Sequence, residues 1–525
     1  MSEEPKKKEN DKPNIGRRDV VTALASIPVF GAFFASYFSK KSRDDYKKQQ
    51  ILNELGMSKE PAGALQPVSR KPGETIRLGI IGFGGEGEAL VRAAGFAHPD
   101  WPKPREQRGR QFRPDTRHQD FLSQDDLKVE LTGVCDVFDV HAERGLAASM
   151  NDERPGGGAG LEGAKRFRHY HEMLESSEID AVLIATPDHW HAQMVIDAVQ
   201  AGKHVYCEKA MTRTEEETFR VVEAVKSSDV VFQLGHQNRQ LASHEKAREI
   251  VQKDVLGKIT LVEMTTNRND PVGAWVYDIH PDAGPETIDW EQFQGPAPNK
   301  VPFSAERFFR WRCWFDYGTG LSGDLLSHEY DAINQILDLG IPKSAMSSGG
   351  VYFFKDGRDV PDVWQVVYEY PDRDLTVMYS ATLANDRARG KVLMGHDAAM
   401  EVGSGIRVIV DTGSTRFKNL LEEEVIDNEL PVLSYQPGYK GVDAITSPTE
   451  EYFASRGLLF TYKEGRRVST LHLHVAEWLD CIRSGKEPSC GIERGFEEAI
   501  TCHMATESYL RGRKVEWDPV QRKIV

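Results

Sequence analysis

The sequence has little cysteine and no excess of positive charge, and both absences exclude classes of protein. Only six of its 525 residues are cysteine, and none of them has Cys-x-x-Cys spacing. This argues against a zinc site or a dense disulfide scaffold, so we predict no metal site and expect the cysteines to be small buried residues. The formal net charge is -15, whereas nucleic-acid-binding proteins normally carry a basic face, so we expect no nucleic-acid partner.

The length exceeds what one ordinary hydrophobic core needs, so we expect two folded domains behind an N-terminal extension. Arg17-Arg18 precede an apolar run from Val20 to Phe38, which resembles a twin-arginine export signal. The run reaches bilayer length and no clear Ala-x-Ala site follows it. We therefore expect residues 1–38 to anchor an exported, periplasmic protein in the membrane. A buried helix is the alternative.

Residues 39–75 are charged and rich in proline and glycine, which predicts a linker. Short apolar runs then alternate with helical segments as far as residue 240, and a Pro-, Arg- and Asp-rich stretch at 98–126 predicts an inserted surface loop. The runs expected to form strands are Ile76–Ile81, Val129–Asp136, Ile179–Pro187, His204–Cys207 and Val231–Leu234. This alternation predicts a doubly wound parallel sheet over residues 76–240, with ligands at the carboxyl ends of its strands.

A glycine-rich turn, Gly82-Phe83-Gly84-Gly85-Glu86-Gly87, follows the first strand and precedes a helix expected from about Glu88. In a dinucleotide-binding fold, Gly82 permits the tight turn, Gly84 lets the backbone approach the pyrophosphate and Gly87 allows close helix packing. A plain strand-to-helix turn is the alternative.

Asp136 ends the second strand and supplies an acceptor for a ribose 2′-hydroxyl. Its charge would repel a 2′-phosphate, so NAD is favoured over NADP. It lies 54 positions after Gly82, a long spacing that the stretch at 98–126 explains. Asp136 could instead cap the next helix.

After residue 240 the apolar residues alternate, which is typical of strands with one open face. Such runs occur at Thr260–Thr266, Val363–Tyr370 and Leu375–Ala381, and helical periodicity follows at Leu473–Arg483 and Gly495–Leu510. We predict a second, α+β domain over residues 241–525, built on a large, mainly antiparallel open sheet.

Three segments together resemble the glucose–fructose oxidoreductase / inositol dehydrogenase (Gfo/Idh/MocA) family: Ala185–His191, Gly202–Lys209 and Gly320–Asp331. The resemblance covers the chain from Ile76 to its end. It implies an N-terminal Rossmann domain, NAD as cofactor, and oxidation or reduction at a CH–OH group of a sugar, glycoside or cyclic polyol. It also implies a possible homo-oligomer, because relatives often pair through the open sheet.

By the same resemblance, Lys209 takes part in proton transfer, with Ala210 where the family usually has proline, and Asp324 and His328 form the other catalytic pair. On a helix these two share one face, so we expect the carboxylate to orient the imidazole and favour its protonated form. A surface lysine, a capping aspartate and a core histidine are the alternatives. Asp331 either orients His328 or faces solvent.

The resemblance further implies that Pro187, His191, Glu208 and Gln237 contact the nicotinamide or its ribose. Several aromatic residues are candidates for stacking on a sugar, although only one or two are expected to serve: Trp190, Trp275, Trp311, Trp314 and Tyr317.

The expected activity is therefore NAD-dependent sugar or polyol oxidation, in which His328 or Lys209 removes the hydroxyl proton. Two alternatives stay open. One is an enzyme that oxidises a sugar transiently and cleaves a glycosidic bond with no net redox change; the other is a non-catalytic ligand-binding protein. Export would favour a cofactor that stays tightly bound.

Overall fold

A computed structural model describes residues 71, 73–101, 117–157, 162–387, 389–424, 426, 428–435, 460–463 and 466–525. All of them fall within the unit Ala64–Val525. The predicted export signal and most of the predicted linker lie outside the described residues. Within the part of the chain that is described, no helix is both long and apolar enough to cross a bilayer.

The first sheet has six parallel strands in the order β3-β2-β1-β4-β5-β6. The strand order reverses between β1 and β4, which opens a crevice at the carboxyl ends of the strands. The doubly wound parallel sheet predicted from the sequence is confirmed. Its strands are β1 (Ile76–Ile81), β2 (Val129–Cys135), β3 (Lys165–Phe167), β4 (Ala181–Ile184), β5 (His204–Cys207) and β6 (Phe232–Leu234).

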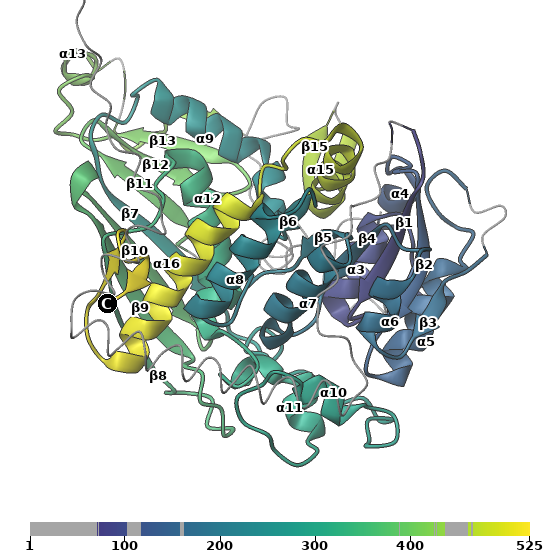
Figure 1. Cartoon of the computed structure of the whole chain (residues 1–525). Coiled ribbons are helices and arrows are strands. Elements are labelled where there is room, and N and C mark those ends of the chain that lie inside the picture. Colours follow the sequence, from purple (N-terminus) through teal and green to yellow (C-terminus); the bar gives the residue numbers. More distant parts are fainter. Residues whose placement is uncertain are drawn as a thin grey trace, which may run out of the picture. The chain divides into compact units, whose positions relative to one another are not determined.

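Helices cover both faces of this sheet (Figure 1). One face packs against α6 (Tyr170–Glu175), α7 (Asp188–Gln200) and α8 (Glu215–Lys226). The other packs against α3 (Gly85–Ala93), α5 (Asp139–Ser149) and α15 (Thr470–Ser484). Because both faces are covered, β1 and β4 consist of almost continuous apolar residues.

The helix α15 comes from the far end of the chain, yet its Leu471 and Trp478 share a core with Leu78 and Ile80 of β1. The parallel sheet is thus completed by residues more than two hundred positions beyond its last strand.

Two predicted segments differ in detail. The helix expected from about Glu88 begins at Gly85, because the last residues of the glycine turn already have helical geometry. The stretch at 98–126 is not loop throughout, since Arg117–Leu122 forms the short helix α4, which buries Phe121.

The second sheet has ten strands in the order β14-β13-β12-β11-β7-β10-β9-β8-β17-β18. Neighbouring strands are antiparallel except for β7 and β10, so the predicted mainly antiparallel sheet is confirmed. Its strands are β7 (Ile259–Asn267), β8 (Ser344–Gly350), β9 (Val363–Tyr370), β10 (Leu375–Thr382), β11 (Lys391–Gly395), β12 (Ala398–Val402), β13 (Ile406–Val410), β14 (Leu433–Tyr435), β17 (Val515–Asp518) and β18 (Lys523–Ile524).

Burial alternates along β9 and β10, so one face of this sheet is packed and the other is open. Helix α16 (Ile492–Arg511) crosses its packed face, with α9 (Ala242–Gln252) and α12 (Ser327–Leu337) beside it (Figure 1). The shorter elements are η1 (Gln237–Gln240), α10 (Trp290–Gln294), α11 (Ala305–Phe309), η2 (Trp311–Cys313), η3 (Ser322–Leu326), η4 (Pro371–Arg373), α13 (Lys418–Glu422), β15 (Phe460–Lys463) and β16 (Arg466–Ser469).

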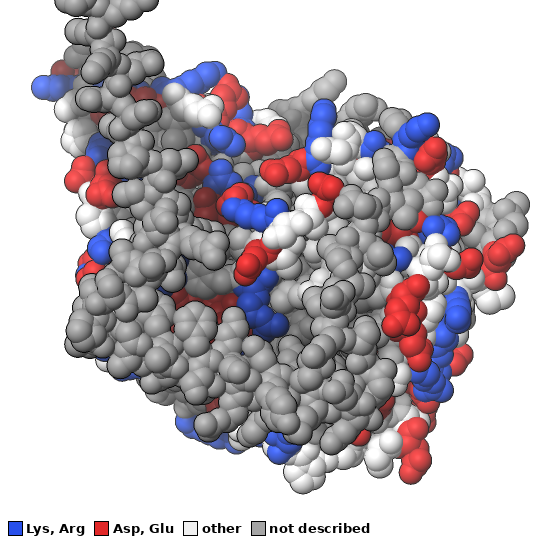
Figure 2. Space-filling view, viewed as in Figure 1, with Lys and Arg blue, Asp and Glu red and all other residues white. Residues whose placement is uncertain are grey.

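Figure 2 shows acidic and basic side chains intermingled on the described part of one face of the molecule. On that part they form no continuous basic surface. All six cysteines are buried, as the sequence predicted, and none of them is bridged.

Two glycines of the first turn are needed for its geometry. Gly82 has a φ of +88°, in the left-handed region that favours glycine. A Cβ on Gly87 would lie 2.0 Å from the carbonyl oxygen of Gly82, so helix α3 approaches the turn as closely as the sequence predicted.

Replacement of Gly87 by alanine is expected to lower the free energy of unfolding by about 1–3 kcal/mol, because backbone must move to admit the methyl group. Gly85→Ala is the matched control, since a Cβ there meets no atom within 4 Å. Denaturant unfolding followed by circular dichroism measures both. Equal stability of the two variants would contradict the close approach of α3 to the turn.

Candidate active site

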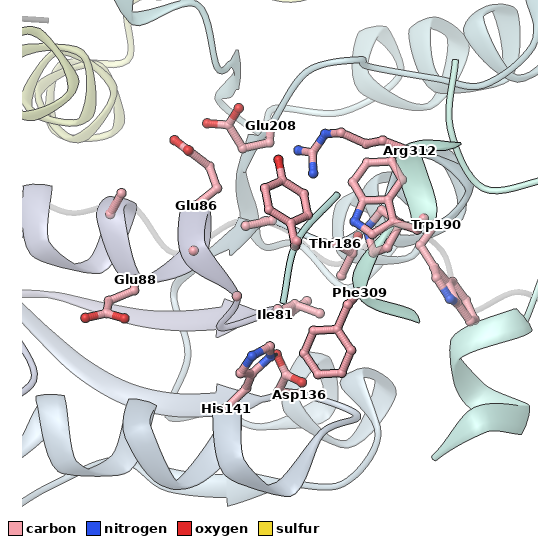
Figure 3. Close-up of a pocket in the computed structure, with 18 of the residues that line it drawn as sticks. Ile81, Glu86, Glu88, Asp136, His141, Thr186, Trp190, Glu208, Phe309 and Arg312 are labelled. Atoms are coloured by element: carbon pink, nitrogen blue, oxygen red, sulfur yellow. The ribbon is translucent and has the colours of Figure 1, made fainter. Parts of the chain in front are cut away.

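A pocket of about 590 Å³ lies at the carboxyl ends of the parallel strands, where the strand order reverses. Its walls include the turn after β1 and the ends of β2, β4 and β5. Side chains of the second domain, selected from the segment between Arg268 and His328, complete them. Figure 3 shows Asp136 and His141 at one end, and Glu86, Glu208 and Arg312 at the other. The two ends of the pocket therefore present different side chains to a ligand (Figure 3).

The glycine turn presents an uncapped helix to this pocket. Gly84 is the N-cap of α3 and provides no side-chain hydrogen bond to the first turn. The first N–H groups of a helix have no partner within it, so this end of α3 suits an anionic group such as a pyrophosphate.

At the same end, Asp136 is fixed by two backbone amides. Phe83 N donates to its Oδ2 at 2.6 Å and Phe138 N donates to its Oδ1 at 2.8 Å, while Nδ1 of His141 lies 3.6 Å from Oδ2. Each carboxylate oxygen keeps a further lone pair for ribose hydroxyls. The uncapped helix and the fixed carboxylate therefore fit a dinucleotide without a 2′-phosphate.

The other end of the pocket is built around the carboxylate of Asp324, which lies in the π-helical turn η3. Lys209 Nζ donates to Asp324 Oδ1 at 2.6 Å and to its carbonyl oxygen at 2.9 Å. Arg312 Nε donates to Oδ1 at 3.0 Å, and the buried indole of Trp275 donates to Oδ2 at 2.9 Å. The peptide bond after Lys209 is cis.

This cluster determines the charge of its members. Burial opposes ionisation of Asp324, but the positive charges of Lys209 and Arg312 outweigh it and hold the pKa of Asp324 well below its ordinary value. The side chains of Lys209 and Asp324 are only 11% and 12% exposed, so their ion pair is largely shielded from water.

His328 lines the same end of the pocket, and its Nδ1 is 3.2 Å from Nδ1 of His236. Burial, together with the positive charge of Lys209, holds the pKa of His328 well below its ordinary value of 6.5. The imidazole is therefore neutral near pH 7 and can accept a proton.

Comparison with known proteins agrees with this geometry. Residues 76–236 match the model of the oxidoreductase family with an NAD-binding Rossmann fold, Gfo/Idh/MocA. The myo-inositol 2-dehydrogenase of Thermotoga maritima is 30% identical over 359 residues, which are 68% of this chain and 85% of that protein. This chain belongs to the Gfo/Idh/MocA oxidoreductase family. It is an NAD-binding oxidoreductase.

Other members of the family match less of their length or at lower identity. The levoglucosan dehydrogenase of Pseudarthrobacter phenanthrenivorans is 28% identical over 205 residues, 36% of this chain and under half, 45%, of that protein. The solved structure of a levoglucosan dehydrogenase with NADH and levoglucosan has a TM-score of 0.55 at 16% identity, and covers 84% of this chain and 99% of its own. That likeness shows the shared fold.

The structure brings most of the predicted site residues to one pocket. Those that line it are Gly82, Gly84, Asp136, Pro187, Glu208, Lys209, Gln237, Asp324 and His328. Gly87 lies behind the glycine turn. His191 also lies outside the lining: it is fully buried, and its ring nitrogens are 2.6 Å from the carbonyl oxygen of Ala210 and 2.7 Å from that of Thr186. His191 thus joins the loops that follow β4 and β5.

The aromatic candidates divide into two groups. Trp190 and Trp311 line the pocket, whereas Trp314 and Tyr317 belong to the core of the second domain. Trp275 is fully buried, and its indole N–H donates a hydrogen bond to Asp324.

Two expectations about the acids near His328 need correction. Asp324 was predicted to orient His328 and favour its protonated form. Its charge does raise the pKa of His328, but burial and the charge of Lys209 outweigh it, so the neutral imidazole is favoured. The carboxylate of Asp324 bonds instead to Lys209, Arg312 and Trp275. The prediction assumed a regular α-helix, whereas Asp324 lies in a π-helical turn. Asp331 neither orients His328 nor faces solvent: it is buried and accepts from Arg239 at 2.6 Å and 2.9 Å.

Sequence reasoning missed several further ionisable groups of the pocket, among them Arg312 and Glu86. Arg312 lies outside the family-like motifs, so nothing in its neighbourhood signals it. Glu86 stands inside the glycine turn, where an ionisable residue is itself a signal. Burial raises the pKa of Glu86, and burial together with the charge of Glu86 raises the pKa of the buried Glu208.

We expect Asp324→Asn to lower kcat by about 100-fold or more, because Lys209 and Arg312 lose their shared counter-ion, while the affinity for NAD changes little. Steady-state kinetics and fluorescence titration with NAD measure the two effects. Glu329→Gln is the matched control: this acid lies on α12, and its ion pair with Lys391 at 2.6 Å is outside the pocket lining. An equal loss of kcat in both variants would show that the loss is structural.

Proposed function

We propose that this protein oxidises a CH–OH group of a sugar, glycoside or cyclic polyol, or reduces the corresponding ketone, with NAD as hydride carrier. One observation carries the proposal: the pocket places a buried ammonium group, Lys209, and a neutral imidazole, His328, beside each other at the end opposite Asp136. A cation and a base at one point are what removal of a hydroxyl proton requires.

The two groups differ in the task they suit. His328 accepts the hydroxyl proton, because its imidazole is neutral and its Nδ1 is already engaged by His236, which leaves Nε2 for the substrate. Lys209 donates to the substrate oxygen and stabilises the negative charge that develops there. Asp324 holds Lys209 in position through two hydrogen bonds. NAD, when bound, supplies the hydride acceptor, and the uncapped end of α3 and Asp136 would hold it.

The substrate class follows from the pocket and from the relatives. Charged groups at the reactive end, including Arg312 and Glu208, offer several hydrogen bonds to a polyhydroxylated ligand, and Trp190 and Trp311 offer apolar faces. A levoglucosan dehydrogenase and a myo-inositol 2-dehydrogenase are among the family members most similar to this chain. Both names point to rings that carry secondary hydroxyl groups.

The direct test incubates the purified protein with NAD and either levoglucosan or myo-inositol, together with a panel of pyranoses and glycosides, and follows NADH by absorbance. We expect NADH formation with at least one of them, and a loss of about 100-fold or more in Lys209→Met and His328→Gln. Denaturation of the protein as isolated, with assay of the supernatant for NAD(H), measures cofactor retention. A protein that neither binds NAD nor turns over any of these compounds contradicts the proposal.

Transient oxidation without net redox change is the second candidate, favoured by one comparison. A glycosyl hydrolase family 109 protein of a Shewanella species is 34% identical over 95 residues, 18% of this chain. Release of a free sugar from a glycoside with no accumulation of NADH would favour this reaction.

The pH dependence follows from the neutral imidazole. As pH falls through the pKa of His328, the ring gains a proton and no longer accepts one, so oxidation is lost on the acid side. Because that pKa lies well below 6.5, we expect kcat/KM at pH 6.5 to remain close to its value at pH 7.5. Rates measured between about pH 5 and pH 8 with saturating NAD check this. A half-maximal rate near or above pH 7 would instead assign the base to another group.

We also propose that the protein is exported through the twin arginines and stays at the membrane through the apolar run that follows them. Arg17→Lys with Arg18→Lys should keep the protein in the cytoplasm, since only the pair changes while the charge is kept. Cell fractionation reports the location. Unchanged export of the double variant contradicts the proposal.

A further inference from the structure

Behind His328, on the side away from the pocket, lies a row of buried titratable groups. His328 Nδ1 is 3.2 Å from His236 Nδ1, and His236 Nε2 is 3.9 Å from Glu498 Oε2. The side chains of His236 and Glu498 are each only 1% exposed. The row therefore runs from the pocket into the protein interior.

Three separate elements bring these groups together. His328 lies on α12, His236 follows β6, and Glu498 lies on α16. The two imidazole rings meet edge to face, with centroids 5.1 Å apart and an interplanar angle of 86°. The backbone N–H of His236 also points at Nε2 of His474, 3.2 Å away, so His236 is held from two sides.

The inner half of the row consists of two buried polar atoms, a ring nitrogen and a carboxyl oxygen. Neither His236 Nε2 nor Glu498 Oε2 has a hydrogen-bond partner among the described residues. Buried polar atoms without a partner are rare and need an explanation. Here a ring nitrogen and a carboxyl oxygen lie 3.9 Å apart, each without another partner among the described residues.

Glu498 also differs from the other acid beside His236. Asp331 is neutralised by its ion pair with Arg239, whereas Glu498 forms no ion pair with a lysine or arginine among the described residues, and its other oxygen accepts from the Cys502 thiol at 3.3 Å. Its carboxyl group is therefore left to pair with His236. The titratable groups around His236 are His328 and Asp331 on α12, Glu498 and Cys502 on α16, and His474 on α15, while Lys209 after β5 acts on His328.

We propose that His236 and Glu498 form a proton relay behind His328, a role that rests on the proposed function. The substrate O–H bond breaks, and its proton binds Nε2 of His328. The proton on Nδ1 of His328 passes to Nδ1 of His236. The Nε2–H of His236 then donates a hydrogen bond to the carboxylate of Glu498. The electron pair of the substrate C–H bond leaves as the hydride that NAD accepts, so no further oxidant is needed. His236 and Glu498 are positioning residues, since neither touches the substrate.

The relay is tested first without turnover, by nitrogen NMR of the full-length protein carrying labelled histidine, with resonances assigned through His328→Gln and His236→Gln. We expect a scalar coupling across the hydrogen bond between the two Nδ1 atoms. Glu498→Gln should lower the pKa at which the histidine pair titrates by about one unit, because the imidazolium loses its nearby negative charge. Glu477→Gln, which removes an acid 3.6 Å from His474 instead, is the matched control and should leave that pKa unchanged.

The second arm measures the pH profile of oxidation. We expect Glu498→Gln to move the acid limb of kcat/KM to lower pH by about one unit and to reduce kcat about tenfold, with KM nearly constant. Glu498→Asp should recover part of the loss. His244→Gln, at another fully buried histidine outside the pocket lining, should leave the limb in place.

The two arms separate the two proposals. No coupling between His328 and His236, or an unshifted limb in an active Glu498→Gln protein, overturns the relay. Absence of NADH formation by the wild-type protein contradicts the proposed function instead, and the NMR measurement then decides whether the hydrogen-bonded pair exists. If Glu498→Gln does not fold, His236→Gln must still move the acid limb, because His328 loses the ring that takes its proton, and an unmoved limb overturns the relay.

Discussion

The buried carboxylate of Asp324 holds the reactive end of the pocket together. A carboxylate in such a place is tolerated only if cations and hydrogen-bond donors compensate for the lost water. Lys209 comes to it from the end of β5, Arg312 from η2, and Trp275 from a turn in which this tryptophan has a φ of +66°. One charge in the second domain thereby fixes a residue that closely follows a strand of the parallel sheet.

The contact between Lys209 and Asp324 also gives different roles to Lys209 and His328, the two candidate bases predicted from the sequence. Lys209 is engaged by the carboxylate of Asp324, whereas burial, together with the positive charge of Lys209, lowers the pKa of His328 and favours its neutral form. The acid–base assignment therefore follows from the ion pair, and not from the types of residue alone. Glu86 and Glu208 add two carboxyl groups to the same end (Figure 3), and burial raises the pKa of both.

Much of the first domain could be predicted because its signals are local. The apolar strands, the glycine turn and Asp136 each depend on neighbours in sequence, and the structure shows Gly87 packed against Gly82 as expected. The strand β3 was not predicted, because only one of its three residues is buried and its sequence has no apolar run. The partners of Asp324 and Asp331 could not be predicted, since Arg312 and Arg239 reach them through tertiary packing. The π-helical turn at Asp324 likewise has no marker in the spacing of apolar residues.

Helix α15 gives the dinucleotide-binding sheet an unusual dependence on the end of the chain. Leu78 and Ile80 of β1 are covered by Leu471 and Trp478, so a nascent chain that has emerged only as far as β6 still exposes that apolar face to water. The core on this face of the sheet is therefore complete only once α15, near the end of the polypeptide, has been made.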